Sequence, residues 1–308
     1  MRFGVSIAQT GRLADPASVR SAATAAEQVG YSSVWVLDRL EIGPGAGGAP
    51  VATADPRPDL MTILDPLGVL TYAAAVTSRV RLGTSVLVAP WYRPALLARS
   101  LTSLDVLSDG RLTVGLGLGG SLDGLGALGV PQQELGRRLD DALDMLDAVW
   151  GGNGAAAGAR PTRIVAGPAP ALPGPVQRPR PPVLLSATTP DGLERVARRA
   201  DGWNPAGLPA DVLAPMWSSL RDLAAGHGRD PDELDLVVRA DLAVTDRPVD
   251  GERAPYHGTI EQIAADIADT RRAGAHEVIL GMHGDHRLDD ALDVYARIAE
   301  SIDLTAVA

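Results

Sequence analysis

The sequence predicts an α/β fold of the (β/α)8 barrel (TIM barrel) type with insertions. Short apolar runs alternate with helical patterns along the chain, and eight strand–helix pairs can be assigned. The clearest strand run, residues 80–88, is apolar almost throughout, as is typical of parallel strands covered on both faces. The 308 residues suit one such barrel, so a single domain over residues 1–308 is expected. An open, doubly wound sheet is the alternative.

The first four pairs precede residue 151. The expected strands are residues 2–8, 33–37, 80–88 and 112–118, and the expected helices are residues 16–29, 62–77, 95–107 and 133–150. The first helix shows the usual boundary signals, because Asp15 and Pro16 can form its N-cap and first turn and Gly30 can end it. Residues 40–60 are rich in Gly and Pro and are expected to form a loop.

The last four pairs follow an interruption. The expected strands are residues 183–187, 202–204, 234–244 and 277–281, and the expected helices are residues 189–199, 210–227, 259–273 and 288–302. Residues 151–182, before them, are rich in Ala, Gly and Pro and show no periodicity. Because the alternation of strands and helices resumes afterwards, this segment is expected to be an insertion loop. One role considered for it is a lid over the substrate.

Composition excludes several classes of function. The net charge of −10 argues against a general nucleic-acid binder. All 28 basic residues are arginine and cysteine is absent, which excludes lysine Schiff bases, a P-loop lysine, thiolate nucleophiles and cysteine metal sites. No apolar run approaches the ~18 residues of a membrane span, and the first residues lack signal-peptide features. A cytoplasmic protein with a small-molecule substrate, and with no membrane or nucleic-acid partner, is expected.

Active sites of such barrels lie on the loops that follow the strands. Asp38 and Arg39 follow the second strand, and Asp38 is either a catalytic acid or a structural hydrogen-bond acceptor. Trp91 and Tyr92 follow the third strand, where they either form the wall of a substrate pocket for a flat ring or are buried under a loop. Arg39 is a further pocket residue, because its guanidinium can bind an anionic group.

Two further segments at strand ends have ligand-binding patterns. Residues 115–120 match GxGxxG, but no helix opens directly after them, so a Rossmann nucleotide site is not favoured. Close approach of the glycine backbone to a ligand is the better interpretation. Residues 186–189 precede a helix, where backbone N–H groups can bind a phosphate; a plain helix cap is the alternative.

The last strand is followed by two histidines and an aspartate within residues 282–286. These residue types can bind a metal, but no further ligand cluster joins them in the sequence. No metal site is therefore predicted, and His283 is assigned to the substrate pocket.

Several segments together resemble the bacterial luciferase-like monooxygenases, in particular the branch of oxidoreductases that depends on the deazaflavin coenzyme F420. These segments are residues 34–39 (VWVLDR), 79–120, 128–150 and 181–203. The resemblance covers nearly the whole chain and implies the same barrel with insertions. It also implies a cofactor, which is F420 or, as the alternative, FMN.

The resemblance assigns specific residues to that cofactor. Those around the ring are Asp38, Thr84, Ser85, Val86, Gly117, Leu118 and Gly119, and those at the phosphate are Ser186, Ala187, Thr188 and Thr189. A cis peptide bond between Ser85 and Val86, behind the ring, is implied as well. The loop arginines available to neutralise the anionic tail of F420 are Arg39, Arg57, Arg93, Arg178 and Arg180.

Two departures from the family bear on the reaction. Arg39 stands where many members have histidine, and Gly120 stands near the glutamate of the F420-dependent sugar-phosphate dehydrogenases. That activity is therefore not expected, and the proton donor is left open. The expected function is hydride transfer between F420 and a small organic substrate. An FMN-dependent luciferase-like monooxygenase and a non-catalytic ligand-binding relative are the alternatives. Family members are often dimers, which suggests a homodimer.

Overall fold

The computed structural model describes residues 1–7, 9–39, 62–119, 129–151, 174–282 and 287–302. The strands are β1 (Arg2–Ser6), β2 (Ser33–Val36), β3 (Arg81–Thr84), β4 (Leu87–Val88), β5 (Leu112–Gly117), β6 (Val183–Leu185), β7 (Gly202–Trp203), β8 (Asp235–Val244), β9 (His257–Gly258) and β10 (Glu277–Met282). The α-helices are α1 (Pro16–Val29), α2 (Pro66–Val76), α3 (Pro94–Leu107), α5 (Leu135–Trp150), α6 (Pro190–Arg199), α7 (Ala210–Gly226), α8 (Ile260–Arg272) and α9 (Leu288–Ser301).

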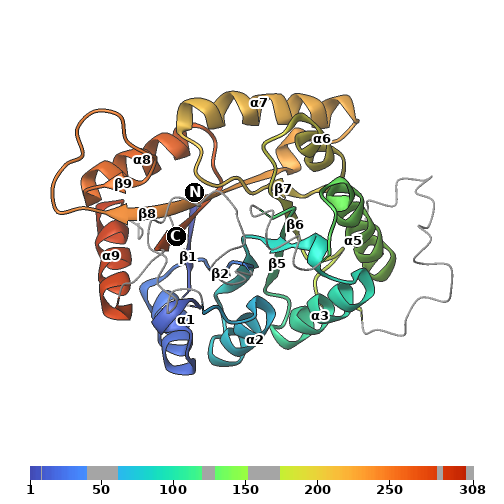
Figure 1. Cartoon of the computed structure of the whole chain (residues 1–308), viewed down its shortest axis with the longest axis horizontal. Helices are drawn as coiled ribbons and strands as arrows, with labels where there is room; N and C mark the ends of the chain where they lie inside the picture. The colour runs from blue at the N-terminus through green and yellow to red at the C-terminus, as the bar shows by residue number, and fades with distance from the viewer. Residues whose placement is uncertain (8, 40–61, 120–128, 152–173, 283–286, 303–308) are drawn as a thin grey trace.

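The strands close into a parallel barrel with the helices around it (Figure 1). The ring closes because β10 pairs with both β1 and β8, and every pairing in it is parallel. With β3 and β4 counted as one interrupted strand, and β9 as an addition beside the end of β8, the barrel has eight strands. The predicted (β/α)8 fold is therefore confirmed, and the open-sheet alternative is wrong.

Apart from shifts of one or two residues at element ends, three elements differ from the prediction. The expected strand 80–88 is interrupted between β3 and β4, where the Ser85–Val86 peptide bond is cis, as the family resemblance implied. The expected helix 62–77 begins only at Pro66, because the Asp65 carboxylate caps it by accepting the N–H of Gly68 at 2.7 Å. Strand β9 was missed, since two residues are too short to produce a periodic signal.

Trp35 fills the inside of the barrel. With Leu184, Val237 and Ile279 it forms a separate buried cluster, distinct from the large core between the barrel and the helices. Gly4 and Gly83, on the two strands beside β2, make room for it, because a Cβ atom at either glycine would collide with the indole ring. This cluster separates the two mouths of the barrel.

The amino-terminal mouth holds a cavity of about 250 Å³ lined by charged residues. Arg2 forms ion pairs there with Asp235 (3.1 Å) and Glu277 (3.2 Å). Glu277 is 4% exposed, and its Oε1 accepts hydrogen bonds from the Ser33 hydroxyl and from Trp35 Nε1 (3.0 Å). The charges at this mouth are thus largely compensated by one another.

The described end of the insertion, residues 174–182, also lies at the amino-terminal mouth. The Gln177 amide donates to Asp105 (2.8 Å) and to the carbonyl of Leu112 at the start of β5 (2.7 Å). A segment that leads from a helix into the next strand must return to this face of a barrel. Residues 174–182 therefore do not lie over the strand ends. Residues 152–173 lie outside the described residues, so the substrate lid stays a prediction. Arg180 is likewise unavailable to a cofactor tail, because it pairs with Asp201 at 2.6 Å and its side chain is 8% exposed.

Candidate active site

Asp38 and Tyr92 meet at the carboxyl-terminal mouth of the barrel. Oδ2 of Asp38, just after β2, accepts the Tyr92 O–H at 2.8 Å and the Val88 N–H at 3.0 Å. The Asp38 N–H donates to the Val86 carbonyl at 3.3 Å. Two residues that the sequence assigned to catalysis and to the substrate pocket are therefore in direct contact.

The surroundings of this pair raise the pKa of both side chains. Burial raises the pKa of Asp38 above its ordinary value, and the bonds from Val88 and Tyr92 offset only part of that effect. Burial, followed by the charge of Asp38, raises the pKa of Tyr92 well above its ordinary value. Tyr92 therefore remains a neutral O–H donor, and Asp38 binds a proton more readily than an exposed aspartate. Both interpretations of Asp38, acid and structural acceptor, are compatible with this geometry.

The Ser85–Val86 segment is held from the opposite wall of the barrel. The Ser85 hydroxyl donates to Asn204 Oδ1 at 2.8 Å, and Arg239 Nη1 donates to the Ser85 carbonyl at 2.9 Å. Asn204 also donates to the Val237 carbonyl at 2.6 Å. The position of Ser85 is thus set by residues that follow β7 and lie on β8.

Asn204, Arg239 and Asp241 belong to this mouth but were absent from the predicted site residues. Arg239 and Asp241 lie two residues apart on β8 and form a bidentate ion pair, with Nε–Oδ1 at 3.0 Å and Nη2–Oδ2 at 3.2 Å. The available signal was two charged residues inside residues 236–244, which are otherwise apolar. Charges in such a run are unusual for a buried strand unless they are paired.

The predicted glycine segment lies beside Ser85 and Val86. A Cβ atom on Gly117 would lie 2.6 Å from Val86 Cγ2, and one on Gly119 would lie 2.9 Å from Val88 Cγ1. Gly119 also has φ +86°, which favours glycine. Thr84 faces the neighbouring strand, where its hydroxyl donates to the Gly115 carbonyl at 2.8 Å. Leu118 packs against both the main core and the small cluster around Val88.

Trp91 differs from its neighbour Tyr92. Its ring packs against the cluster of Val88, Val130 and Leu135. Its Nε1 is buried and has no hydrogen-bond partner in the part of the chain that the structure describes. A buried donor without an acceptor is costly, and such atoms are rare in native proteins. Arg39, the other predicted pocket residue, is exposed.

The predicted phosphate segment connects β6 to α6. The Thr189 hydroxyl accepts the Gly192 N–H at 3.2 Å as the helix cap, and the Ala187 carbonyl accepts Trp203 Nε1 at 2.8 Å. Ser186 is half-buried, and Thr188 and Thr189 are exposed. The plain cap is therefore present, and the phosphate role stays a prediction.

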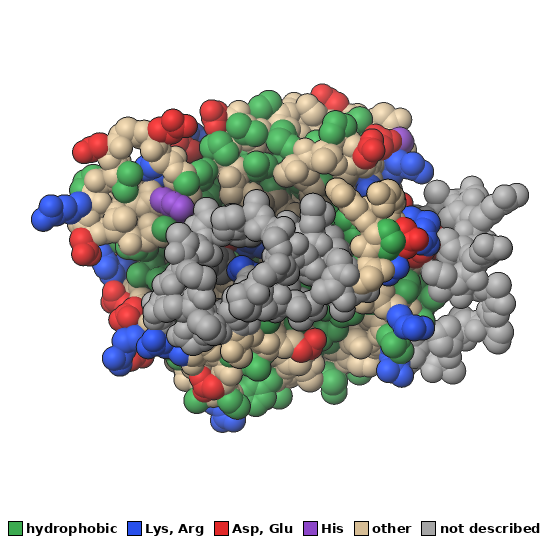
Figure 2. All heavy atoms as spheres, in the orientation of Figure 1, with side chains coloured by type: hydrophobic (Ala, Val, Ile, Leu, Met, Phe, Trp, Pro, Cys, Tyr) green, Lys and Arg blue, Asp and Glu red, His purple; other side chains and the backbone are tan. Residues whose placement is uncertain are grey.

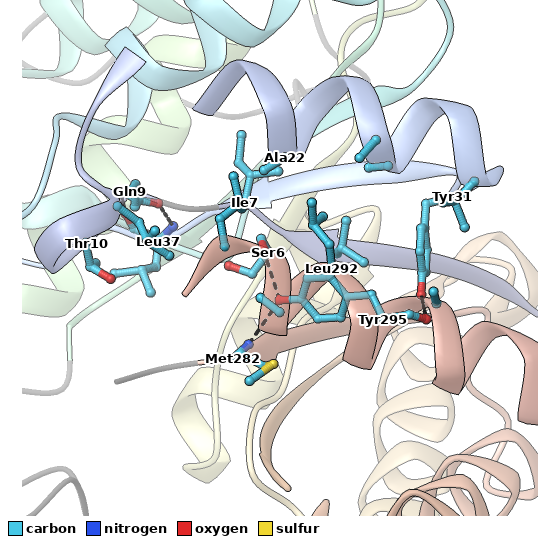
Figure 3. A pocket seen from close by; sticks show the side chains of 18 residues that line it. Ser6, Ile7, Gln9, Thr10, Ala22, Tyr31, Leu37, Met282, Leu292 and Tyr295 are labelled. Atoms are coloured by element: carbon cyan, nitrogen blue, oxygen red, sulfur yellow. Dashed lines mark hydrogen bonds between the residues drawn. The ribbon is translucent and has the colours of Figure 1, made fainter. Parts of the chain in front are cut away.

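A second pocket lies outside the barrel, between β1, α1 and α9 (Figure 3). Its cavity of about 60 Å³ is lined mainly by apolar side chains. Tyr295 Oη accepts a hydrogen bond from the Met282 N–H (3.1 Å) and donates one to the Ser6 carbonyl (3.2 Å). Gln9 Nε2 donates to the Leu37 carbonyl at 2.9 Å, which fixes the chain just before Asp38. The residues around this pocket therefore help to position Asp38, and the pocket itself is mainly apolar.

Some predictions cannot be placed. His283, Gly120 and Arg57 lie outside the described residues. Among the described residues, no group of three His, Asp or Glu side chains converges as metal ligands do. No described helix has both the length and the apolar character needed to cross a bilayer. On the face of the molecule shown in Figure 2, acidic and basic side chains are interspersed around the periphery.

Comparison with known proteins identifies the family. A family model for luciferase-like monooxygenases matches residues 1–303. The chain belongs to this family. The luciferase-like chain is 32% identical over 306 residues to an uncharacterised protein of Mycobacterium tuberculosis, covering 98% of this chain and 99% of the relative.

Two further relatives bear on cofactor and fold. An F420-dependent glucose-6-phosphate dehydrogenase of Nakamurella multipartita is 30% identical over 244 residues, covering 75% of this chain and 65% of the relative. The crystal structure of the monooxygenase RslO1 from Streptomyces bottropensis superposes with a TM-score of 0.77 at 22% identity, over all of both chains. The latter similarity shows the shared fold.

Proposed function

We propose that this luciferase-like protein is an oxidoreductase that binds F420 and transfers a hydride to or from a small organic substrate. The observation that carries the proposal is the half-buried Asp38 carboxyl at the carboxyl-terminal mouth, which accepts hydrogen bonds from Tyr92 and Val88. Its own N–H donates to the Val86 carbonyl, so an acid with a raised pKa lies directly beside the segment where the family resemblance puts the cofactor ring. The buried Trp91 Nε1, which has no hydrogen-bond partner among the described residues, is a second sign of a ligand site at this mouth.

The family resemblance assigns the residues that would hold this cofactor. Asp38, Thr84–Val86 and Gly117–Gly119 would hold the ring, and Ser186–Thr189 would hold the phosphate at the start of α6. A bound deazaflavin supplies the two-electron chemistry as a hydride acceptor or donor. Asp38 would take up or release the proton that accompanies this transfer, because burial raises the pKa of its carboxyl, while Tyr92 donates a hydrogen bond to it.

F420 is preferred over FMN because a curated relative with 30% identity is named as F420-dependent. FMN with oxygen remains the alternative, since the family model describes monooxygenases. A non-catalytic ligand-binding relative is the second alternative, motivated by Arg39 and Gly120 at the two departures. The homodimer and the substrate remain predictions.

Fluorescence titrations of the purified protein with F420 and with FMN test this proposal. Preferential binding of F420 supports it and directs substrate screening to alcohols, ketones and enones. Preferential binding of FMN favours the oxygen-using alternative. Failure to bind either cofactor overturns the assignment and favours a ligand-binding role.

A further inference from the structure

Arg239 reaches across the barrel. In the closed strand order β1, β2, β3, β5, β6, β7, β8, β10, strand β8 lies opposite β3. Arg239 on β8 nevertheless donates from Nη1 to the carbonyl of Ser85, the residue that follows β3, at 2.9 Å. The arginine side chain therefore crosses the floor of the carboxyl-terminal mouth and places its charge next to the Ser85–Val86 segment.

The charge of Arg239 is partly compensated within the same strand. Asp241 accepts from Nε and Nη2 at 3.0 and 3.2 Å. Val237, two residues earlier, belongs to the cluster inside the barrel, so Arg239 and Asp241 also face inward by the alternation of side chains along a strand. Their side chains are 26% and 35% exposed, so the pair is neither fully buried nor fully screened by water.

We propose that Arg239 favours the reduced form of the bound cofactor, and that Asp241 limits how much of this positive charge the cofactor experiences. The proposal rests on the proposed function. Reduction by hydride adds two electrons and one proton to the ring, which makes the ring more negative by one charge. A nearby guanidinium therefore stabilises the reduced form more than the oxidised form. The step requires no reactant beyond the hydride donor of the proposed reaction.

Two substitutions in this one ion pair are expected to act in opposite directions. Arg239→Met removes the cation, so the protein should bind the reduced cofactor less tightly than wild type does. The reduction potential of the bound cofactor should therefore fall. Asp241→Asn removes the compensating carboxylate, so the potential should rise. A tenfold change in the ratio of oxidised to reduced dissociation constants corresponds to about 30 mV for a two-electron couple. A change of this size is expected for each variant.

The measurement is the reduction potential of the bound cofactor, F420 or FMN, by anaerobic equilibration with a reference dye. Arg239→Lys should keep part of the wild-type potential, because it retains the charge. Asp241→Asn is the stricter variant, since it leaves Arg239 and its bond to Ser85 in place. If Arg239→Met does not fold, the potential of Asp241→Asn alone still tests the proposal.

A matched control is Arg195→Met on α6. Arg195 pairs with Asp140 of α5 through the same atoms, with Nε–Oδ1 at 2.7 Å and Nη2–Oδ2 at 3.1 Å, but outside the barrel. The Arg195→Met substitution should leave the reduction potential of the bound cofactor unchanged. Potentials that move in the same direction in both β8 variants, or stay at the wild-type value, overturn the proposal for Arg239. Failure of the wild-type protein to bind either cofactor is a different result, which overturns the proposed function itself.

Discussion

The two mouths of the barrel are built from the same strands but handle polar groups differently. At the amino-terminal mouth, Arg2 pairs with two carboxylates, and the Trp35 N–H is bonded to Ser33 and Glu277. At the carboxyl-terminal mouth, the buried Trp91 N–H finds no partner within the described ranges. One end satisfies its polar groups internally, whereas the other keeps a donor unused.

The same contrast appears in two carboxyl groups. Glu27 on α1 accepts backbone N–H groups just before β3, at the amino-terminal end, and its pKa is lowered. Asp38, at the other end, has a raised pKa because burial dominates. The comparison indicates that the amino-terminal end serves stability, and it supports the proposal that the carboxyl-terminal end gives up some stability for a ligand.

The largest expected effect is on stability, from Trp35→Ala. The change empties the inside of the barrel and should lower the free energy of unfolding by about 3–5 kcal/mol. Urea denaturation followed by fluorescence measures it. Trp35→Phe, which keeps a ring but loses the N–H bonds, should cost less. Unchanged stability in Trp35→Ala would contradict the role of this residue as the structural filling of the barrel.

Gly117→Ala should act mainly on binding. Its Cβ would lie 2.6 Å from Val86 Cγ2, so the Val86 side chain in the Ser85–Val86 segment must shift, at a cost of about 1–3 kcal/mol in stability. Because that segment is part of the proposed ring site, cofactor affinity should fall about tenfold or more, which is about 1.4 kcal/mol. Titration with F420 measures the affinity.

Gly226→Ala on α7 is the control for this substitution, since no heavy atom lies within 4 Å of its Cβ position. It should leave the affinity unchanged. Equal affinities of Gly117→Ala and wild type would remove Gly117 from the proposed site.

The fold was predictable because long repeated patterns determine it. Helices such as α1 and α6 carry a cap and a first-turn proline in the sequence and begin where predicted. The break after Thr84 was not visible in the residue pattern, because an apolar run reads the same whether it is one strand or two. It was expected only from the family resemblance.

The site was predictable only in part, and the reason is geometric. Asp38 and Tyr92 are separated by 54 positions, and their contact depends on how η3 (Ala89–Trp91) turns after β4. Strand-end position identified each residue but not the bond between them. The contact of Arg239 with Ser85 joins opposite walls of the barrel across 154 positions, which no sequence spacing can indicate.

Glu27→Gln should weaken the amino-terminal end in a pH-dependent way. Burial raises the pKa of Glu27, but the N–H bonds from Val80, Arg79 and Ser78 together outweigh it and leave the pKa below its ordinary value. The ionised group therefore stabilises the fold above the unfolded-state pKa, and this stabilisation is lost as pH falls through the folded-state pKa. The substitution should cost about 1–2 kcal/mol near neutral pH and little in acid, by urea denaturation across pH. A cost that does not diminish in acid would contradict this account.

The smallest expected effect, and the one of opposite sign, is that of Asp38→Asn. The folded-state pKa of Asp38 is raised, so the wild-type protein loses stability as pH rises from the unfolded-state pKa to the folded-state pKa, and the cost persists above it. Asparagine keeps an acceptor oxygen for Val88 or Tyr92 and has no charge to bury. Its free energy of unfolding should therefore equal or exceed that of wild type near neutral pH and lose that advantage in acid.

Urea denaturation of both proteins from about pH 4 to about pH 8 measures this difference. If Asp38→Asn is the less stable protein near neutral pH, the carboxylate is a structural acceptor whose bonds to Val88 and Tyr92 outweigh its burial. The carboxyl-terminal mouth would then resemble the other end of the barrel at this position. If it is at least as stable, the native protein keeps an acid that its fold does not need, which is the pattern expected of a group retained for reaction with a ligand.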